Sequence, residues 1–438
     1  MNIIWQTIKW FSDGSHWSGD MGIPHRVLEH VEVSAFALVL ATALALPIGL
    51  LIGHTRRGEL VAVSIGNLGR ALPSFGILAI ITVLTPPLWK KLERFRTGPD
   101  YRIPYALSKD YWLYERRLQQ IAPTNVVVLG DSVVWGEYVL PDGTLSHFLQ
   151  SGQPGKFVNA GVNGLFPLAL EGLVRYYGGP LRGRKVLVHC NVLWMSSPKA
   201  DLRTEKEERF NHAELVPQFV PRIPCYKTDL NHRLSAVVER HFPFSQWVTH
   251  LQNACFGQKT IPNWTLEEDG SDPPHYPNAY KNPFAQITFT IPAEPANDPK
   301  RGPRSPRHKP WSGTSGSPGE GTTRFEWVEL DQSLQWAAFQ RLVKLLESRG
   351  NEVLVLVGPF NEHIMAEENR PAFRRLRDGI ADWLAKNHVT YVVPATLPSA
   401  LYADASHPLT EGYQRLAGEL WNDAQFRDWM KQKRAGRR

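Results

Sequence analysis

The stretch NVVVLGDSVVWGEY, residues 125–138, is an apolar run that stops abruptly at a Gly-Asp-Ser turn. Residues 125–130 are mainly apolar and β-branched, which predicts a short buried strand. Gly130 permits a tight turn, and Asp131 and Ser132 are polar at the point where such a strand ends. In an open α/β sheet, ligands bind outside the carboxyl ends of the strands. Ser132 is therefore placed to act either as a nucleophile or as a helix N-cap.

Similar strand patterns recur along the chain and alternate with helical patterns. Strand-like runs follow at 156–160, 185–190, 351–357 and 390–393, and helical patterns occupy 165–178, 331–349, 369–386 and 410–430. This alternation predicts an α/β fold, with a parallel sheet and helices on both faces. Residues 200–325 interrupt the alternation and are expected to form an insertion. Within it, residues 292–325 are rich in Pro, Gly, Ser and basic residues, which predicts disorder.

The composition is that of a globular protein of 438 residues, long enough for two or three domains. Charged residues make up 21% and hydrophobic residues 42%. The net charge of +7 lies largely in the tail and in one loop, so no nucleic-acid partner is expected. Cys190, Cys225 and Cys255 lack C-x-x-C spacing, which argues against a zinc ribbon but allows one disulfide in an oxidising compartment. No metal or other cofactor is expected.

Residues 1–89 differ from the rest of the chain because they hold two long apolar runs. From Ser34 to Gly53 there are 20 consecutive uncharged residues, enough to cross a hydrocarbon core. A weaker run covers residues 71–89, with prolines near both ends. We expect membrane spans at about 33–53 and 71–89, the alternative for each being a buried helix of a soluble domain.

Two basic clusters bear on the orientation of these spans. Arg56 and Arg57 predict that loop 54–70 is cytoplasmic, which would place everything after the second span outside the cytoplasm. The segment KKLERFR, residues 90–96, is also basic and favours the opposite orientation. Because the first span is the stronger insertion signal, we expect a cell-membrane protein whose C-terminal domain faces the periplasm or the cell exterior.

The sequence EHVEVSAFALVLATALALPIGLLIGHTRRGE, followed by IGNLGRALPSFGILAIITVL, resembles the start of the permease subunit of glycine betaine/choline-type ABC importers. The resemblance covers residues 25–85 and implies transmembrane transport with an ABC ATPase as partner. The remaining chain shows no counterpart of the later permease helices or of the loop that grips the ATPase. A gene fusion, or an error of gene assembly, near residue 85 would account for this junction.

Chemically active residues stand at the ends of the predicted strands. VNAGVNG (158–164) ends the second strand, KVLVHCNVLWMSS (185–197) contains the third, and LYADASHPLTEGYQRLA (401–417) follows the fifth and opens a helix. Together with the first turn, these segments would bring to one edge of the sheet Ser132, Gly164, Asn191, Asp404 and His407. A nucleophile, an oxyanion hole and a base would have to meet there. Taken alone, Asp404 and His407 would be interpreted as a loop acid and a helix-start histidine, but the order of the four segments favours catalysis.

These segments resemble, in the same order, those of the GDSL/SGNH hydrolase superfamily, over roughly residues 123–200 and 350–425. GDS matches the nucleophile block, NAGVNG the block with the oxyanion glycine, and DASHP the closing D-x-x-H block. The resemblance implies a flavodoxin-like parallel sheet with helices on both faces. It also implies that Ser132 is the nucleophile, His407 its general base and Asp404 the residue that orients the imidazole.

The same resemblance implies an oxyanion hole made by the Ser132 N–H, the Gly164 N–H and the Asn191 side chain. The third block departs from the usual Gly-x-Asn-Asp, because here the run is His189-Cys190-Asn191-Val192. The residue types suit the chemistry: a serine hydroxyl is a weak nucleophile until a base removes its proton, and an imidazole is matched to neutral pH.

Further polar and aromatic residues lie near these segments. VLVGPFNEHIMAEENR follows the fourth strand, and we expect Asn361 and His363 to bind substrate, the alternative being a helix-start cluster. Trp135 and Trp194 follow the first and third blocks and would either stack on a sugar ring, the role we expect of Trp135, or pack in the core. Two other histidines are expected to have structural roles. His147 is expected on a packed surface helix and His189 in the core.

The sequence thus predicts a membrane segment at 1–89, a juxtamembrane stalk and helix at 90–122, and an SGNH-type hydrolase domain at 123–438. The expected activity is that of a membrane-anchored serine hydrolase acting on an O-acyl ester, on a carbohydrate or cell-envelope polymer. An acyltransferase would use the same acyl-enzyme. The alternatives from other classes are an ABC permease subunit and a non-catalytic domain that retains the fold.

Overall fold

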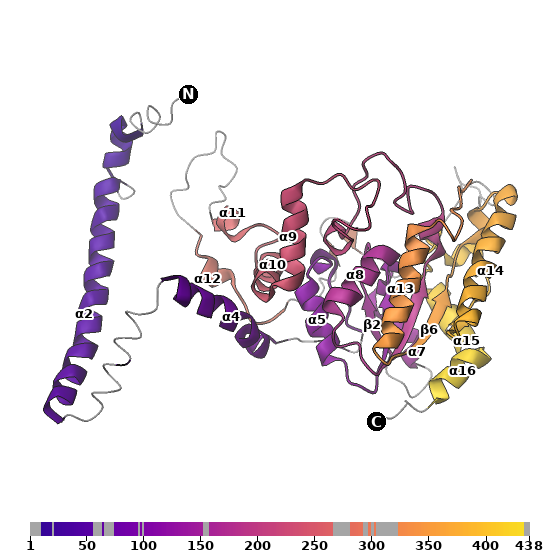
Figure 1. The fold of residues 1–438 in the computed structure, drawn as a ribbon, viewed down its shortest axis with the longest axis horizontal. Helices are drawn as coiled ribbons and strands as arrows, with labels where there is room; N and C mark the ends of the chain where they lie inside the picture. The colour runs from indigo at the N-terminus through magenta and orange to yellow at the C-terminus, as the bar shows by residue number, and fades with distance from the viewer. Residues whose placement is uncertain are drawn as a thin grey trace. The chain divides into compact units, whose positions relative to one another are not determined.

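A computed structural model describes residues 10–19, 22–55, 64, 74–94, 97–98, 100–151, 157–265, 281–291, 297–298, 302–303 and 323–432 (Figure 1). The chain divides into two compact units. The N-terminal unit comprises residues 1–84 and 262–283, and the sheet unit comprises residues 85–261 and 284–438.

The sheet unit is built on a five-stranded sheet in which all neighbouring strands are parallel. The strands are, in spatial order, β2 (Phe157–Gly161), β1 (Val126–Gly130), β3 (Lys185–Cys190), β6 (Glu352–Val357) and β7 (Thr390–Val392). Counted within this sheet, the order is 2-1-3-4-5, a doubly wound arrangement whose switch point lies between β1 and β3. The five strands predicted from the sequence are confirmed, as is the α/β class with a parallel sheet.

The side chains of the strands alternate between the two faces of the sheet. In β1, Val127 and Leu129 join the core on one face, whereas Val126 and Val128 join the core on the other. Every residue of β1 is buried. A strand covered on both faces needs apolar side chains at every position, which explains the unbroken apolar run in the sequence.

Helices cover both faces of the sheet (Figure 1). One face carries α5 (Tyr111–Gln120), α8 (Pro167–Tyr177), α13 (Leu334–Ser348) and α14 (Arg370–Lys386), and the other carries α7 (Leu145–Ser151), α15 (Thr410–Asn422) and α16 (Ala424–Lys431). The sequence predicts one helix over 410–430, and the structure corrects this to two. Asp423 ends α15, and its carboxylate caps α16 by accepting the N–H of Phe426.

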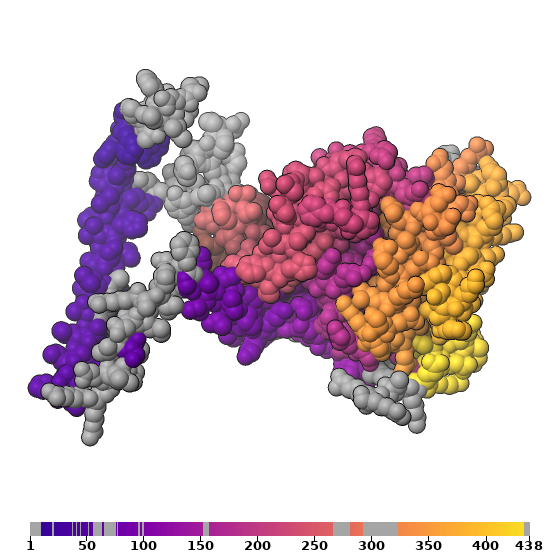
Figure 2. Space-filling model, in the orientation of Figure 1, coloured from indigo at the N-terminus to yellow at the C-terminus, as the bar shows by residue number. Residues whose placement is uncertain are grey.

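The insertion at 200–325 contains α9 (Leu230–His241), α10 (Pro243–Cys255) and the short helices α11 (Ile261–Thr265) and α12 (Pro283–Gln286). Its first part is fixed to the sheet unit by the carboxylate of Asp201. This group accepts hydrogen bonds from Ser333 and from the first N–H groups of α13. Figure 2 shows the surface of this part of the chain, in pink, continuing into that of α13, in orange.

The predicted disorder at 292–325 lies mostly outside the described residues. Within that range, β4 (Asn297–Asp298) and β5 (Gly302–Pro303) form a short antiparallel pair. The three cysteines are free thiols in this structure, so the disulfide that the sequence allows is not formed.

The N-terminal unit contains α2 (Ile23–Thr55), which includes the predicted span 33–53. Among the described residues it is the one helix long and apolar enough to cross a membrane. Most of the apolar side chains that the structure describes in α2 are exposed, and that of Phe36, for example, is 70% exposed. The predicted cytoplasmic loop with Arg56 and Arg57 lies outside the described residues.

The second predicted span, 71–89, falls on α4 (Ser74–Leu92), which does not meet the same criterion. The last turns of α4 belong to the sheet unit. There, Trp89 is 9% exposed and packs against Trp247 and Phe289. In the same turns Leu88 is 57% exposed, so protein covers this end of the helix only in part, and the second span stays a prediction.

The predicted stalk, residues 90–122, is built into the sheet unit, where Leu113 of α5 is fully buried. A buried ionic cluster holds this segment to the insertion. His250 of α10 lies 2.7 Å from a carboxylate oxygen of Glu93 and 2.8 Å from one of Asp110. Burial alone would lower the pKa of His250, but Asp110 and Glu93 raise it to about 10. His250 is therefore a cation between two carboxylates.

We expect His250→Leu to destabilise the fold, because it leaves two carboxylates buried without their counter-charge. Breaking a buried ion pair in this way costs about 3–5 kcal/mol of unfolding free energy. Urea unfolding followed by tryptophan fluorescence measures the loss. His232→Leu is the matched control, because the pair of His232 with Asp229 is exposed.

The contribution of His250 to stability depends on pH, and the direction of this dependence follows from its pKa. The pKa of His250 is higher in the folded chain than the value of about 6.5 expected on unfolding. Its contribution to stability is therefore complete below about pH 6.5 and is lost as the pH rises through about 10. The wild-type chain should lose more stability between these pH values than His250→Leu does, and equal losses would contradict the assignment.

Candidate active site

Asp131, rather than Ser132, caps the short helix α6 (Ser132–Trp135) that follows β1. The carboxylate of Asp131 accepts the N–H of Val133 at 3.0 Å. Ser132 therefore occupies the first helical position, where its own N–H has no acceptor within the helix. Its hydroxyl is not used for capping, so the N-cap interpretation of Ser132 is wrong.

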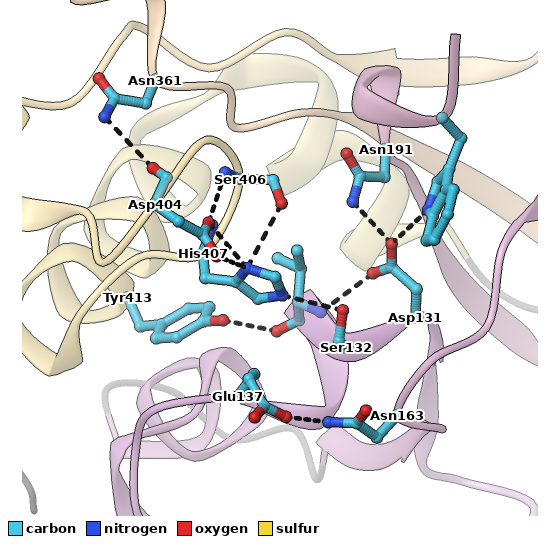
Figure 3. A network of polar contacts seen from close by, with 12 residues as sticks. Asp131, Ser132, Glu137, Asn163, Asn191, Asn361, Asp404, Ser406, His407 and Tyr413 are labelled. Carbon is cyan, nitrogen blue, oxygen red and sulfur yellow. Dashed lines mark hydrogen bonds and ion pairs between the residues drawn. The ribbon is translucent and has the colours of Figure 1, made fainter. Parts of the chain in front are cut away.

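Ser132, His407 and Asp404 form a continuous hydrogen-bonded chain (Figure 3). The hydroxyl oxygen of Ser132 lies 2.8 Å from Nε2 of His407, and Nδ1 of His407 lies 2.8 Å from each carboxylate oxygen of Asp404. Nδ1 faces an acceptor and therefore carries the proton of the neutral ring. Nε2 is thus the nitrogen that can accept the serine proton. The structure brings together these three predicted residues.

The surroundings of His407 favour its cationic form. Burial alone would lower the pKa of His407, but the hydrogen bond and charge of Asp404 raise it above its ordinary value, with smaller contributions from Asp131 and Glu137. Burial would raise the pKa of Asp404, but His407 and neighbouring backbone N–H groups lower it below its ordinary value. Asp404 therefore stays ionised at neutral pH and stabilises the imidazolium that forms when His407 takes a proton.

The loop that carries Asp404 and His407 is held in place by Asn361. The N–H of Asn361 donates to the carbonyl of Ala405 at 2.9 Å, and its side-chain amide donates to the carbonyl of Asp404 at 3.2 Å. Asn361 is fully buried, and Figure 3 shows its side chain directed at the backbone of Asp404. The prediction that Asn361 binds substrate is therefore corrected: the residue supports the loop that carries Asp404 and His407.

Asn191 lies at the site, as predicted, but its side chain is already engaged. Its amide nitrogen donates to Asp131 at 2.7 Å, and its oxygen accepts the N–H of Leu193 at 3.0 Å. A side-chain amide has two N–H groups, so one remains for an oxyanion. The role of Asn191 in an oxyanion hole stays a prediction.

Asp131 is the centre of a second polar network, which the sequence does not reveal. Besides the Asn191 amide, it accepts bonds from Nδ1 of His189 at 3.0 Å and Nε1 of Trp194 at 3.1 Å. Burial would raise the pKa of Asp131, but His189, Asn191 and Trp194 together hold it well below its ordinary range. His189 is in the core, as predicted, but it also helps to keep a buried carboxylate ionised beside Ser132.

Gly164 stands beyond the end of β2, on the sheet edge that carries Ser132. Its φ of +78° lies in the left-handed region, and a Cβ at this position would come within 2.7 Å of the Asn211 amide nitrogen. The positive φ favours glycine here, and a side chain at this position would also displace the Asn211 amide. Asn211 belongs to the insertion and is exposed, and no pattern in the sequence signals its approach to this block.

The residue before it, Asn163, connects this block to the nucleophile turn. Its side-chain amide donates to the carboxylate of Glu137, and the N–H of Glu137 donates to the carbonyl of Ser132 at 3.0 Å. Figure 3 shows this pair beside Ser132. The second block and the nucleophile turn are thus in direct contact, as the sequence predicts.

Trp135 does not line an open site. It is 1% exposed, its indole N–H donates to the carbonyl of Ile103 at 2.7 Å, and the guanidinium of Arg102 lies 3.9 Å from its ring centre. The prediction that Trp135 stacks on a substrate is therefore wrong, because its ring is buried against Arg102 and its N–H is used inside the protein.

His363 and His147 lie in different surroundings. His363 is half-buried, and its Nε2 lies 3.0 Å from the carbonyl of Leu397, so its part in substrate binding stays a prediction. Nδ1 of His147 lies 3.0 Å from a carboxylate oxygen of Asp100 near the surface, in agreement with the predicted position on a packed surface helix.

Sequence reasoning misses three side chains that shape the nucleophile turn. Arg102 is buried and donates to the carbonyls of three residues that follow Ser132, namely Trp135, Gly136 and Val139. Tyr413 donates to the carbonyl of Val133 at 2.7 Å, and the ring of Tyr138 meets that of His407 edge to face. Tyr138 and Tyr413 each lie in one of the quoted segments, but nothing in the sequence signals these contacts. Arg102 stands in an irregular segment with no signal of its role.

No known protein family model matches this chain, and no curated protein matches it. Within the part of the chain that the structure describes, no group of three or more His, Cys, Asp or Glu side chains could hold a metal ion. The geometry of the triad is thus the evidence for the chemistry of this site.

The raised pKa of His407 predicts the pH dependence of the reaction. A histidine base must be neutral to accept a proton, and its raised pKa keeps it protonated to a higher pH than a free imidazole, whose pKa is about 6.5. We expect kcat/KM for a short-chain acyl ester to rise with pH through an apparent pKa above that value. A pH–rate profile of the purified chain measures it.

Asp404→Asn should move this inflection to lower pH, because it removes the charge that raises the pKa of His407. It should also reduce kcat by about 10³–10⁴, since the imidazolium loses its partner. Asp428→Asn serves as the control, because Asp428 is an exposed residue of α16. An inflection that stays in place, or moves to higher pH, would contradict the assigned roles.

Proposed function

We propose that this protein is a membrane-anchored serine hydrolase of the GDSL/SGNH type, acting on an O-acyl ester. The observation that carries the proposal is the chain of hydrogen bonds from Ser132 through His407 to Asp404. The strand order and the position of Ser132 after β1, next to the switch point, support an SGNH-type sheet.

The proposed reaction begins when His407 Nε2 removes the proton of the Ser132 hydroxyl as its oxygen attacks the ester carbonyl. The carbonyl oxygen becomes an oxyanion, stabilised by the N–H of Ser132 and by donors at Gly164 and Asn191. The imidazolium then gives its proton to the leaving alkoxide, and the C–O bond breaks. An acyl-enzyme and a free alcohol remain.

The second half of the reaction repeats these steps with a new nucleophile. His407 takes a proton from water, whose oxygen attacks the acyl-enzyme, and returns that proton to the Ser132 oxygen as the carboxylic acid leaves. A sugar hydroxyl in place of water would make the enzyme an O-acyltransferase. Both reactions use the same residues.

The proposed substrate is an acyl ester on a carbohydrate or cell-envelope polymer. Its support is the apolar helix α2, which is long enough to hold the chain at a cell membrane, where such polymers lie. The permease resemblance of residues 25–85, with an ABC ATPase as partner, stays a prediction.

Ser132→Ala should abolish turnover of a short-chain acyl ester such as p-nitrophenyl acetate, because no other group supplies the nucleophile. The fold should persist, since the Ser132 hydroxyl bonds only to His407 among the described residues. Ser348→Ala, at an exposed position of α13, is the matched control. Wild-type turnover by folded Ser132→Ala would show that Ser132 is not the nucleophile.

The sheet unit should face the periplasm or the cell exterior. This orientation requires the apolar part of α4 to return the chain across the bilayer, and its side chains at Ile81, Val83 and Leu84 are exposed. Alkaline phosphatase fused after residue 438 should be active, because it folds only outside the cytoplasm. A silent fusion, together with an active cytoplasmic reporter at the same point, would rule out this orientation and the envelope substrate.

A further inference from the structure

A buried histidine of the insertion contacts the second motif block. His212 is 1% exposed and adopts a left-handed backbone conformation with φ of 55°. Its Nε2 lies 2.8 Å from the carbonyl oxygen of Asn163, and its Nδ1 lies 3.0 Å from the hydroxyl of Tyr111. His212 thus connects the insertion, α5 and the block that ends in Gly164.

The chemistry of its partners fixes the proton on this ring. A carbonyl oxygen only accepts hydrogen bonds, so Nε2 must carry a proton and donate it to Asn163. Burial lowers the pKa of His212 to about 4, so the ring is neutral at physiological pH. In a neutral ring Nδ1 is then an acceptor, and the Tyr111 hydroxyl donates to it.

The carbonyl that His212 holds belongs to the peptide bond that supplies the N–H of Gly164. In a trans peptide, the C=O and the N–H are rigidly coplanar and point in opposite directions. Fixing the Asn163 carbonyl therefore fixes the direction of the Gly164 N–H. The same peptide is restrained a second time by the bond from the Asn163 side chain to Glu137.

We propose that His212 is a positioning residue of the oxyanion hole: by binding the Asn163 carbonyl, it keeps the Gly164 N–H aimed at the acyl oxygen. The inference rests on the proposed function and deepens it. An oxyanion donor is effective only when its direction is set before the reaction. A glycine at positive φ has low barriers to reorientation, so the peptide before Gly164 needs an external restraint. His212 supplies this restraint from outside the motif.

Two substitutions separate the bond to Asn163 from the other roles of His212. In His212→Gln, the side-chain amide nitrogen occupies nearly the place of Nε2 and can still donate to the Asn163 carbonyl. In His212→Asn, the amide ends near the place of Nδ1, so it can meet Tyr111 but cannot reach Asn163. Both variants are polar, and asparagine is well suited to a left-handed conformation.

Steady-state kinetics on a short-chain acyl ester, with the full chain, give the first test. His212→Asn should reduce kcat by about tenfold to 100-fold, less than the 10²–10³ expected for complete loss of a donor, while KM changes by less than about twofold. His212→Gln should stay within about threefold of wild type. Affinity for a boronic acid, which forms a tetrahedral adduct with a serine oxygen, should fall about tenfold in His212→Asn only.

Three outcomes would overturn the proposal: wild-type kcat in His212→Asn, equal losses in both variants, or a loss confined to KM. If neither variant folds, Tyr111→Phe replaces them, because it frees the ring to rotate away from Asn163. Its kcat should then fall about threefold or more, and wild-type kcat would count against the proposal. The Ser132→Ala variant tests the proposed function independently of His212. Full activity of that variant would refute the serine mechanism, whatever the His212 variants show.

Discussion

The geometry of the site depends on one buried carboxylate, that of Asp131. A carboxylate without water must be satisfied by donors, and Asp131 receives them from the Val133 backbone, His189, Asn191 and Trp194. These bonds tie the end of β1 to the end of β3, across the switch point of the sheet. Because Asp131 also caps α6, the hydroxyl of Ser132 is not needed for capping and bonds to His407 instead. The position of Ser132, the proposed nucleophile, is therefore a consequence of how Asp131 is held.

The strands could be predicted from the sequence because a strand covered on both faces leaves an unbroken apolar run, as in Val126 to Leu129. The triad could be predicted because parallel strands end at one edge, so the order of the motifs along the chain carries spatial information. Both inferences use properties of short segments of the sequence. The break at Asp423 was beyond this reasoning, since the apolar period continues through it.

Side-chain orientation could not be predicted in the same way. Trp135 and Asn361 stand where a site residue is expected, but one packs under Arg102 and the other supports the Asp404 loop. A sequence shows that a residue follows a strand, but it does not show toward which side the side chain of that residue turns. For His212, in contrast, the sequence contains no signal of its contact with the site. His212 lies in an insertion with no periodic pattern, and its left-handed conformation has no signature in a histidine.

Three buried or partly buried histidines show how the partners of an imidazole decide its charge. His250 lies between two carboxylates, which raise its pKa to about 10, so it is a cation at neutral pH and holds the insertion to Glu93 and to Asp110, the N-cap of α5. His212 meets a hydroxyl and a carbonyl, and burial lowers its pKa to about 4, so it stays neutral with a fixed proton. The ring of His407 contacts one carboxylate, that of Asp404, and one hydroxyl, that of Ser132. Its pKa is raised, but it lacks the second contacting carboxylate that His250 has. The first two hold the framework, and the third is left free to change its charge.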